Sequence, residues 1–263
     1  MSRAPDVLER IAERRRERLA ELADAQEAAS GLVPAPVLDS GRNAFLAALK
    51  RRRGRAVIAE IKLGSPRLGS LVGKVGPLAQ ARTYARHGAA ALSVVVEPDF
   101  FHGSYDLLAR CSDASGLPAL AKDFVLHPVQ LLWAREAGAE AVLLIASLLT
   151  SEELHRLAGL ARGLELVPLV ETHDAADVAK LGGEAWELVG VNNRDLRTFE
   201  VDLERSAELL PSLPAAALKV AESGISGGED VRRLARAGFD AFLVGEALLL
   251  ADDPGALLAE LAG

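Results

Sequence analysis

The stretch Val57–Gly69, VIAEIKLGSPRLG, determines the fold that we expect for the whole chain. It opens with a short apolar, β-branched run, which predicts a buried strand. Glu60 and Lys62 interrupt this run two residues apart, so both side chains point to the same face of the strand. Buried charges cost desolvation free energy unless they pair or contact a substrate. The glycines that follow predict a loop at the charged strand end, where parallel α/β folds carry their active sites.

The residues of this stretch allow two other interpretations. Gly64 and Gly69 have the spacing of a P-loop, but Ser70 stands where that motif needs lysine, so we exclude nucleotide binding there. An ion pair between Glu60 and Lys62 that only closes the end of a strand fits the stretch equally well. The same pattern of charge at strand ends recurs along the chain, and this recurrence favours a functional site.

Composition limits the class of protein. The length of 263 residues is typical of one (β/α)8 barrel domain. A formal charge of −7 argues against a dedicated nucleic-acid binder, whereas an anionic small-molecule substrate stays compatible. Cys111 is the only cysteine, which excludes an intrachain disulfide and a thiolate metal cluster. No apolar run reaches the ~20 residues of a membrane span, so we expect a cytoplasmic protein with no membrane partner.

Residues 1–54 are predicted to form a helical N-terminal extension of the single domain 1–263. An apolar stripe with charges three residues apart predicts one amphipathic helix over 3–29, and the run Arg14-Arg15-Arg16 is interpreted as part of its solvated face. A proline-containing linker over 32–40 and a second helix over 43–52 then lead into the strand at Val57.

From Val57 onward, predicted strands and helices alternate at the spacing of βαβ units. Proline or serine stands near the start of several helices, and glycine follows the end of several others. Eight strands that each precede a helix predict an α/β fold of the (β/α)8 TIM barrel type, with a doubly wound open sheet as the alternative. The expected strands are 57–61, 91–96, 118–121, 141–145, 166–170, 187–191, 218–221 and 240–244, and the expected helices are 77–87, 104–113, 128–137, 151–162, 174–182, 202–210, 228–237 and 254–262.

Charged and polar side chains stand at most of the predicted strand ends. Catalytic groups of such barrels come from the C-terminal ends of several strands. Packing alone does not explain this many charges in one small volume, so we predict an active site. Its candidate residues are Glu60, Lys62, Lys122, Glu171, Asn192 and Glu222, with Glu97, Asp123 and Arg194 beside them.

Several neighbouring residues admit simpler roles. Asp123 and Asp195 are interpreted as loop caps or ion-pair partners of nearby cations. Arg194 either holds a substrate anion or clamps Glu222. His173 follows Glu171 by two residues, but the sequence lacks the histidine spacing of a metal site, so we expect no metal ion.

Glycine-rich segments follow the seventh and eighth predicted strands. They are Ser223-Gly224-Ile225-Ser226-Gly227-Gly228 and Gly245-Glu246. Glycines let backbone N–H groups approach an anion, and barrels commonly bind phosphate at these two loops. Glycines that serve only the turns are the simpler alternative. The presence of both segments favours a phosphorylated substrate.

The motifs also carry a resemblance to a known family. From about residue 5 to the C-terminus the chain resembles indole-3-glycerol phosphate synthase, a (β/α)8 barrel of tryptophan biosynthesis with an extra N-terminal helical segment. The resemblance rests on EIK…SP, SVVVE…FFHGSYDLL, KDF, LVET, GVNNRDL, AESGI and LVGEAL, in this order. It implies cofactor-free ring closure of 1-(2-carboxyphenylamino)-1-deoxyribulose 5-phosphate to indole-3-glycerol phosphate, with loss of CO2 and water.

The resemblance also implies residue roles. Lys122 matches the general acid at the carbonyl, and Lys62 the group that binds the departing carboxylate and assists dehydration. Glu60 orients Lys62, and Glu171 steadies positive charge on the substrate nitrogen or acts as a base. The remaining matches are Asn192 and Glu222 at the ribulose hydroxyls and proton-transfer network, Phe101 and Phe124 at the aromatic ring, and Ser65, Ser223, Gly224, Gly245 and the backbone of Glu246 at the phosphate.

Three other classes of protein are alternatives to an indole-3-glycerol phosphate synthase. An aminodeoxysugar isomerase typically needs a Cys/Asp pair, and Cys111 lies away from the strand ends. A Schiff-base aldolase that uses Lys122 or Lys62, and a non-catalytic barrel scaffold, are further alternatives. Retention of both lysines and three glutamates argues against the scaffold. As partners we expect only the phosphorylated substrate and, at most, a second copy in a weak homodimer.

One segment departs from the family pattern. After Lys62 the family usually has arginine, yet this chain has Leu63, and Arg67 stands where serine is usual. Either Arg67 replaces the lost cation from a shifted loop, or the chain is a divergent paralogue with an altered substrate. The first explanation is the one we favour.

If Arg67 supplies the missing cation, Arg67→Ser removes a contact to the ground-state anion. We therefore expect KM to rise more than kcat falls. Steady-state kinetics with the carboxyphenylamino-deoxyribulose phosphate measures both constants, and unchanged kinetics would exclude the compensation.

Overall fold

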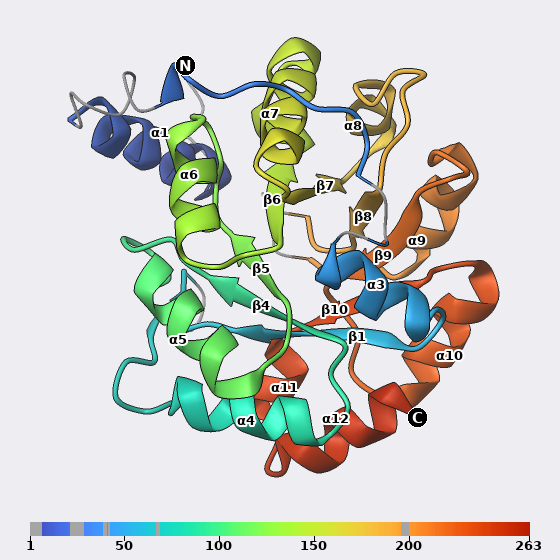
Figure 1. The fold of residues 1–263 in the computed structure, drawn as a ribbon. Helices are drawn as coiled ribbons and strands as arrows, with labels where there is room; N and C mark the ends of the chain where they lie inside the picture. Colours follow the sequence, from blue (N-terminus) through green and yellow to red (C-terminus); the bar gives the residue numbers. More distant parts are fainter. Residues whose placement is uncertain (1–6, 22–28, 39–40, 42, 67–68, 196–199) are drawn as a thin grey trace, which may run out of the picture.

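The computed structural model describes residues 7–21, 29–38, 41, 43–66, 69–195 and 200–263. In this part of the chain eight parallel strands close into a barrel in the order β1-β10-β9-β8-β7-β6-β5-β4. Figure 1 shows the strands at the centre and the helices around them. The barrel strands are β1 (Ala56–Ile61), β4 (Ala91–Val95), β5 (Ala119–Lys122), β6 (Ala141–Ile145), β7 (Val167–Thr172), β8 (Leu188–Asn192), β9 (Leu218–Glu222) and β10 (Ala241–Val244).

The closed barrel confirms the prediction of a TIM barrel, and the open doubly wound sheet is wrong. Closure depends on β1, which pairs in parallel with β10 on one side and with β4 on the other. All eight predicted strands are present, with ends that differ by at most two residues from those expected. The regular βαβ spacing explains this success, because each right-handed crossover brings the next strand beside the last.

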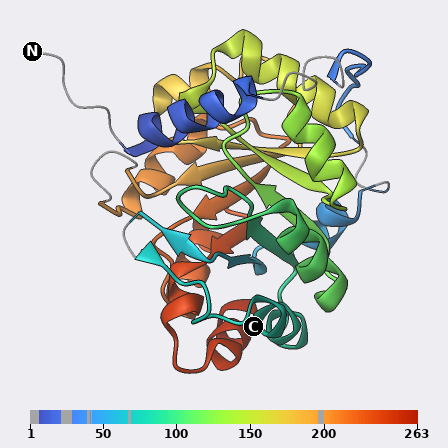
Figure 2. The same ribbon diagram turned by 90° about the vertical axis from the view of Figure 1, so that its left-hand side faces the viewer.

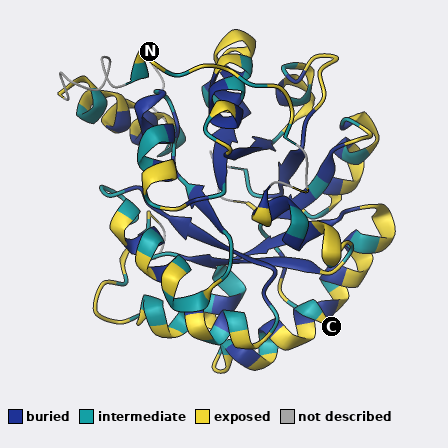
Figure 3. Ribbon diagram, in the orientation of Figure 1, coloured by how far each residue is buried: buried dark blue, intermediate teal, exposed yellow. Residues whose placement is uncertain are grey.

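Alternating residues of each strand divide the core into an inner and an outer layer. The inner cluster includes Ile58, Leu120, Leu169 and Val220, together with three side chains of α3 that close one end of the barrel. The outer cluster packs the strands against the surrounding helices. Figure 3 shows the strands buried and the outer helices exposed on one side only. Glu60, Lys122, Glu171 and Glu222 of the predicted site lie two residues after these four inner residues, on the same face of their strands.

The outer helices match the predicted pattern, with one omission. They are α4 (Pro77–Arg86), α5 (Tyr105–Ser115), α6 (Val129–Glu136), α7 (Ser151–Gly163), α8 (Ala175–Ala179), α9 (Glu204–Leu209), α10 (Gly228–Ala237) and α12 (Pro254–Ala262). Side chains of Ser104, Thr150 and Asp253 cap the N-termini of three of them. The short α11 (Glu246–Leu250) was not predicted, because five residues are too few to show a helical period.

The N-terminal extension contains α1 (Val7–Ala20) and α3 (Ala44–Arg51) in the described residues. The prediction of one helix over 3–29 is wrong, because α1 ends at Ala20 and Glu21 lies in a turn. Residues 1–6 and 22–28 of that prediction lie outside the described part. Figure 2 shows α1 on the same side of the molecule as the small hairpin of β2 (Gly64–Ser65) and β3 (Gly69–Ser70).

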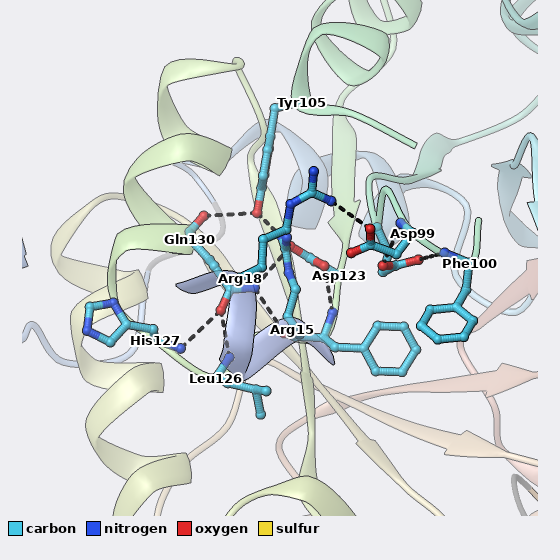
Figure 4. Close-up of polar contacts among 11 residues, drawn as sticks. Arg15, Arg18, Asp99, Phe100, Tyr105, Asp123, Leu126, His127 and Gln130 are labelled. Atoms are coloured by element: carbon cyan, nitrogen blue, oxygen red, sulfur yellow. Dashed lines mark hydrogen bonds and ion pairs between the residues drawn. The ribbon is translucent and has the colours of Figure 1, made fainter. Parts of the chain in front are cut away.

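Arg15 corrects the interpretation of the arginine run as a solvated face. Its side chain is 5% exposed and lies 2.5 Å from Asp123, the residue after Lys122. Asp123 also accepts hydrogen bonds from the Tyr105 hydroxyl at 2.8 Å and from Gln130 at 3.0 Å, as Figure 4 shows. Burial opposes the charge of Arg15, but Asp123 outweighs it and holds the pKa of Arg15 above its usual value. The amphipathic pattern predicted the helix, but not this partner 108 residues away.

A second ion pair joins α1 to the loop after β4. Arg18 lies 2.9 Å from Asp99 (Figure 4). The Glu97 carboxylate accepts hydrogen bonds from the backbone N–H groups of Asp99, Phe100 and Phe101. Glu97, expected among the strand-end charges, therefore orders the loop that carries Phe101.

Among the described helices, none combines the length and apolar content needed to cross a membrane.

The Arg15–Asp123 pair supports a stability prediction. Arg15→Met leaves a buried carboxylate without its counter-charge, so we expect the free energy of unfolding to fall by about 3 kcal/mol. Arg16→Met, at the exposed neighbouring position, is the matched control and is expected to change it by less than about 0.5 kcal/mol. Urea denaturation followed by circular dichroism measures both, and equal stabilities would contradict the role assigned to the pair.

Candidate active site

One cavity of about 180 Å3 lies at the C-terminal ends of the barrel strands. All fourteen residues predicted for catalysis or substrate binding line it, although they lie at the ends of seven different barrel strands or in the loops that follow them. The lining includes Glu60, Lys62, Ser65, Phe101, Lys122, Phe124, Glu171, Asn192, Arg194, Glu222, Ser223, Gly224, Gly245 and Glu246. The geometry therefore unites the predicted residues, whereas their individual roles stay predictions.

Glu60 lies between the two lysines of the site. Its Oε1 accepts a hydrogen bond from Lys62 Nζ at 2.9 Å, and its Oε2 lies 3.7 Å from Lys122 Nζ. Burial opposes ionisation of Glu60, but the two ammonium groups outweigh it, so the pKa of Glu60 lies below its usual value. The structural ion pair considered for Glu60 and Lys62 exists, and it also extends to a second cation inside the cavity.

Lys122 is the most strongly surrounded cation of the cavity. Burial alone would lower its pKa, but the carboxylates of Glu60, Glu171 and Glu222 outweigh burial and raise the pKa to about 12. Lys122 is therefore a protonated ammonium at neutral pH. A charged donor in a partly dry cavity is suited to protonating or polarising a carbonyl oxygen.

Glu171 and Glu222 are two neighbouring carboxyls with opposite pKa shifts. Burial raises the pKa of Glu222 well above its usual value, and the nearby charge of Glu171 raises it further. Burial also opposes ionisation of Glu171, but His173, Lys122 and Asn192 outweigh it and lower its pKa. One carboxyl therefore carries a proton while the other is ionised, the arrangement that separates acid from base roles.

Two glycines, one in β8 and one directly after β10, make room for these carboxylates. A Cβ on Gly190 of β8 would lie 2.1 Å from Glu222 Oε1, and one on Gly245 would lie 2.3 Å from Glu60 Oε1. Neither glycine has a left-handed backbone, so close approach explains both. Gly190 was not predicted, because its only signal in the sequence is a glycine two residues before the strand-end Asn192.

The opposite side of the cavity is apolar. The rings of Phe101 and Phe124 lie with centroids 6.1 Å apart, and Ile145 of β6 lines the cavity with them. Ile145 agrees with the hydrophobic wall that its strand end predicted. Ile11 of α1 lines the cavity from the N-terminal extension. A flat aromatic substrate matches this surface.

The glycine-rich segments after β9 and β10 border the same cavity. Ser223 has φ 65° and Gly224 has φ 80°, so two consecutive residues adopt the left-handed region directly after β9. Such strain in a non-glycine residue is a feature of functional sites. Gly245 precedes α11, whose first residue, Glu246, pairs through its carboxylate with Arg194 at 3.2 Å.

The segment that departs from the family pattern forms the β2–β3 hairpin. Gly64 pairs with Ser70, and Ser65 with Gly69. Leu63 packs against the outer apolar cluster, and Ser65 lines the cavity. Arg67, proposed to compensate for the missing cation, lies outside the described residues.

Two aspartates that follow strand ends have structural partners. Asp123 caps the backbone N–H of Phe124 and pairs with Arg15, which confirms the predicted class of role although the partner is distant. The backbone N–H of Asp195 donates a hydrogen bond to the Glu200 carbonyl. Within the described part of the chain, no group of three or more His, Cys, Asp or Glu side chains is placed to hold a metal ion.

A closed parallel barrel with lysines, glutamates and phosphate-type loops at its C-terminal strand ends defines a barrel enzyme. Comparison with known proteins gives the family. The sequence model described as "Indole-3-glycerol phosphate synthase" matches residues 8–261. The chain belongs to the indole-3-glycerol phosphate synthase family, carboxy-lyases of tryptophan biosynthesis that act on a phosphorylated small molecule.

Individual relatives support this assignment. The indole-3-glycerol phosphate synthase of Albidiferax ferrireducens is 46% identical over 220 residues, which cover 82% of this chain and 83% of that protein. That of Acidithiobacillus ferrooxidans is 41% identical over 265 residues, covering 97% and 98% of the two chains. The solved tryptophan synthase subunit alpha from Legionella pneumophila, 16% identical, covers 84% of this chain and 97% of its own with a TM-score of 0.59, and supports the fold alone.

Gly190 allows a test of the cavity geometry. Gly190→Ala places a methyl group where Glu222 lies, so we expect kcat to fall by about 100-fold as Glu222 is displaced. Gly183→Ala is the matched control, since a Cβ there meets nothing within 4 Å. Turnover and thermal unfolding of both variants separate the two effects, and a fully active Gly190→Ala would contradict the space constraint.

Proposed function

We propose that this chain closes the pyrrole ring of 1-(2-carboxyphenylamino)-1-deoxyribulose 5-phosphate with the roles set out below. The observation that supports the proposal best is the Lys62–Glu60–Lys122 arrangement, two cations that share one carboxylate in an apolar-walled cavity. The reaction forms a carbon–carbon bond, releases CO2 and then releases water. No step in this scheme needs a cofactor.

The first step is attack of the aromatic carbon that bears the carboxylate on the ketone carbon. The ketone oxygen gains negative charge as the new bond forms, and a proton from Lys122 Nζ converts it to a hydroxyl. The raised pKa of about 12 keeps this donor protonated before the reaction. Glu60, 3.7 Å away, orients the ammonium group and disperses its charge.

Decarboxylation and dehydration follow at the other lysine. The ammonium of Lys62 pairs with the substrate carboxylate until CO2 leaves and the bonding electrons restore the aromatic ring. The hydroxyl made in the first step then departs as water, with a proton from Lys62 and with electrons from the ring nitrogen. Glu60 Oε1, 2.9 Å from Lys62 Nζ, holds this ammonium in place.

The glutamate pair serves the end of the reaction. Departure of water leaves positive charge on the substrate nitrogen, and the ionised Glu171 stabilises this charge and accepts the proton that is lost to form indole. Glu222, whose pKa is raised by burial and by Glu171, is the protonated partner in the same network. Asn192, on the neighbouring strand, contacts the ribulose hydroxyls together with Glu222.

The ends of the substrate bind at opposite sides of the cavity. The aromatic ring lies against Phe101 and Phe124, and the phosphate lies at Ser65 and the segments after β9 and β10. Backbone N–H groups of Gly224, Gly245 and Glu246 are the proposed phosphate donors. Ser223 adds its hydroxyl, and Arg194 adds a positive charge, which Glu246 orients.

Loss of the proposed general acid tests this scheme. Lys122→Ala is expected to lower kcat by about 1,000-fold, since positioned proton transfer contributes about 100- to 10,000-fold. Lys219→Ala, on β9 but before its C-terminal end, is the matched control and is expected to leave kcat unchanged. Fluorescence of the indole product measures turnover.

The outcomes of this experiment are distinct. A folded wild-type protein that forms no indole-3-glycerol phosphate would exclude the proposed substrate. A wild-type protein that turns over, with a fully active Lys122→Ala variant, would assign the general acid to another residue.

A further inference from the structure

His173 lies directly behind the cavity and has no role in the scheme above. It follows β7, and its Nε2 lies 3.2 Å from Glu171 Oε1. Its Nδ1 lies 3.4 Å from Asp177 Oδ2. The imidazole therefore bridges two carboxylates, one inside the cavity and one outside it. Glu171 lines the cavity, and among the described residues His173 is not part of the lining.

The backbone around α8 fixes this ring. Asp177, 3% exposed, accepts a hydrogen bond at 3.1 Å from the backbone N–H of His173 through the oxygen that also faces the ring. The other Asp177 oxygen lies 3.3 Å from Lys180 Nζ, which donates to the Ala146 carbonyl at 2.7 Å. Asp174 caps α8 by accepting from the Asp177 backbone N–H at 2.9 Å. Asp177 is therefore held on both sides before it contacts the imidazole.

We propose that His173, held by Asp177, is a positioning residue whose imidazolium keeps Glu171 ionised and leaves the shared proton of the glutamate pair on Glu222. This inference rests on the proposed function, because it assigns a cause to the state that Glu171 needs as a base. Each ring nitrogen lies within ion-pair distance of a carboxylate oxygen, which favours a ring protonated on both nitrogens, since a neutral imidazole has one N–H only.

The surrounding charges support the same protonation states. Burial lowers the pKa of His173, but Asp177 and Glu171 outweigh burial and raise the pKa to about 10. The charged groups that face Glu171 from the other strands are Lys122 on β5, Glu222 on β9 and, further away, Glu60 on β1. Lys122 is shared among three carboxylates, whereas His173 approaches Glu171 within 3.2 Å, so His173 distinguishes Glu171 from Glu222.

The unpaired oxygens of the site agree with a shared proton. Among the described residues, Oε2 of Glu171, both carboxyl oxygens of Glu222 and both ring nitrogens of His173 form no hydrogen bond. Buried carboxyl oxygens without donors are costly when ionised. A proton on Glu222 removes one of these charges, and the imidazolium compensates the other.

Kinetics as a function of pH test the inference. His173→Asn removes the cation and keeps a polar amide, so we expect kcat to fall by about 10- to 100-fold with little change in KM. Loss of a cation beside a carboxylate raises its pKa by about 1–3 units, so the acidic limb of the kcat/KM profile should move to higher pH by a comparable amount. Asp177→Asn should move the acidic limb in the same direction by a smaller amount. Asp177→Glu keeps a carboxylate and should keep the limb at its wild-type position.

A matched control separates this effect from loosening of α8. His155→Gln removes another imidazole that contacts the same segment, since His155 Nε2 lies 2.9 Å from the Lys180 carbonyl. Its other partner, Glu184, lies outside the cavity lining. We expect this variant to keep the wild-type pH profile and kcat. A shift in this variant equal to that of His173→Asn would overturn the inference.

NMR of the unaltered protein gives a test that does not depend on a substitution. Nitrogen chemical shifts of the His173 ring should report an imidazolium from pH 6 to pH 8.5. A neutral His173 ring at pH 8, or an unshifted acidic limb in an active His173→Asn variant, overturns the inference. A wild-type protein without ring-closing activity would instead exclude the proposed function. The NMR experiment would still report whether the His173 ring is charged.

Discussion

The structure depends on the placement of charge on the inner face of a barrel whose interior is otherwise apolar. Below the strand ends, the inner face carries residues such as Ile58, Leu169 and Val220. Two residues further along the same strands, it carries Glu60, Glu171 and Glu222. Ionised groups are tolerated there only when each has a counter-charge. The two lysines and the imidazole of His173 supply these charges to Glu60 and Glu171, whereas the raised pKa of Glu222 favours its neutral form.

The pattern of residues in the sequence was sufficient for the barrel and for the six charged and polar residues at its strand ends. Period-two alternation defines the inner face of each strand, and βαβ spacing brings all the C-terminal ends to one side. A strand-end residue such as Glu222 therefore needs no contact information to be placed in the site. The helix boundaries near Glu21 and Glu246 were missed because charge and short length obscure the apolar period.

Local sequence patterns did not predict the contacts between segments that are distant in the chain. Arg15 stands in an arginine-rich run on an amphipathic helix, and nothing local distinguishes it from the exposed Arg14 and Arg16. Its burial follows from docking of α1 over the barrel, where Asp123 needs a counter-charge. Position 190 is a similar case. It requires glycine only because Glu222 from the next strand lies against it in the folded barrel.

The N-terminal extension and the catalytic cations are linked through one strand end. Lys122 points into the cavity, and the next residue, Asp123, points outward to Arg15, Tyr105 and Gln130 (Figure 4). A strand places successive side chains on opposite faces, so fixing Asp123 also fixes the direction of Lys122. The loop with Phe101 is tied to α1 by Arg18 and Asp99. Helix α1 therefore fixes the proposed general acid from outside the barrel, which explains the buried arginine on its polar face. The helix also covers the aromatic side of the cavity, which explains why its apolar face lines the site.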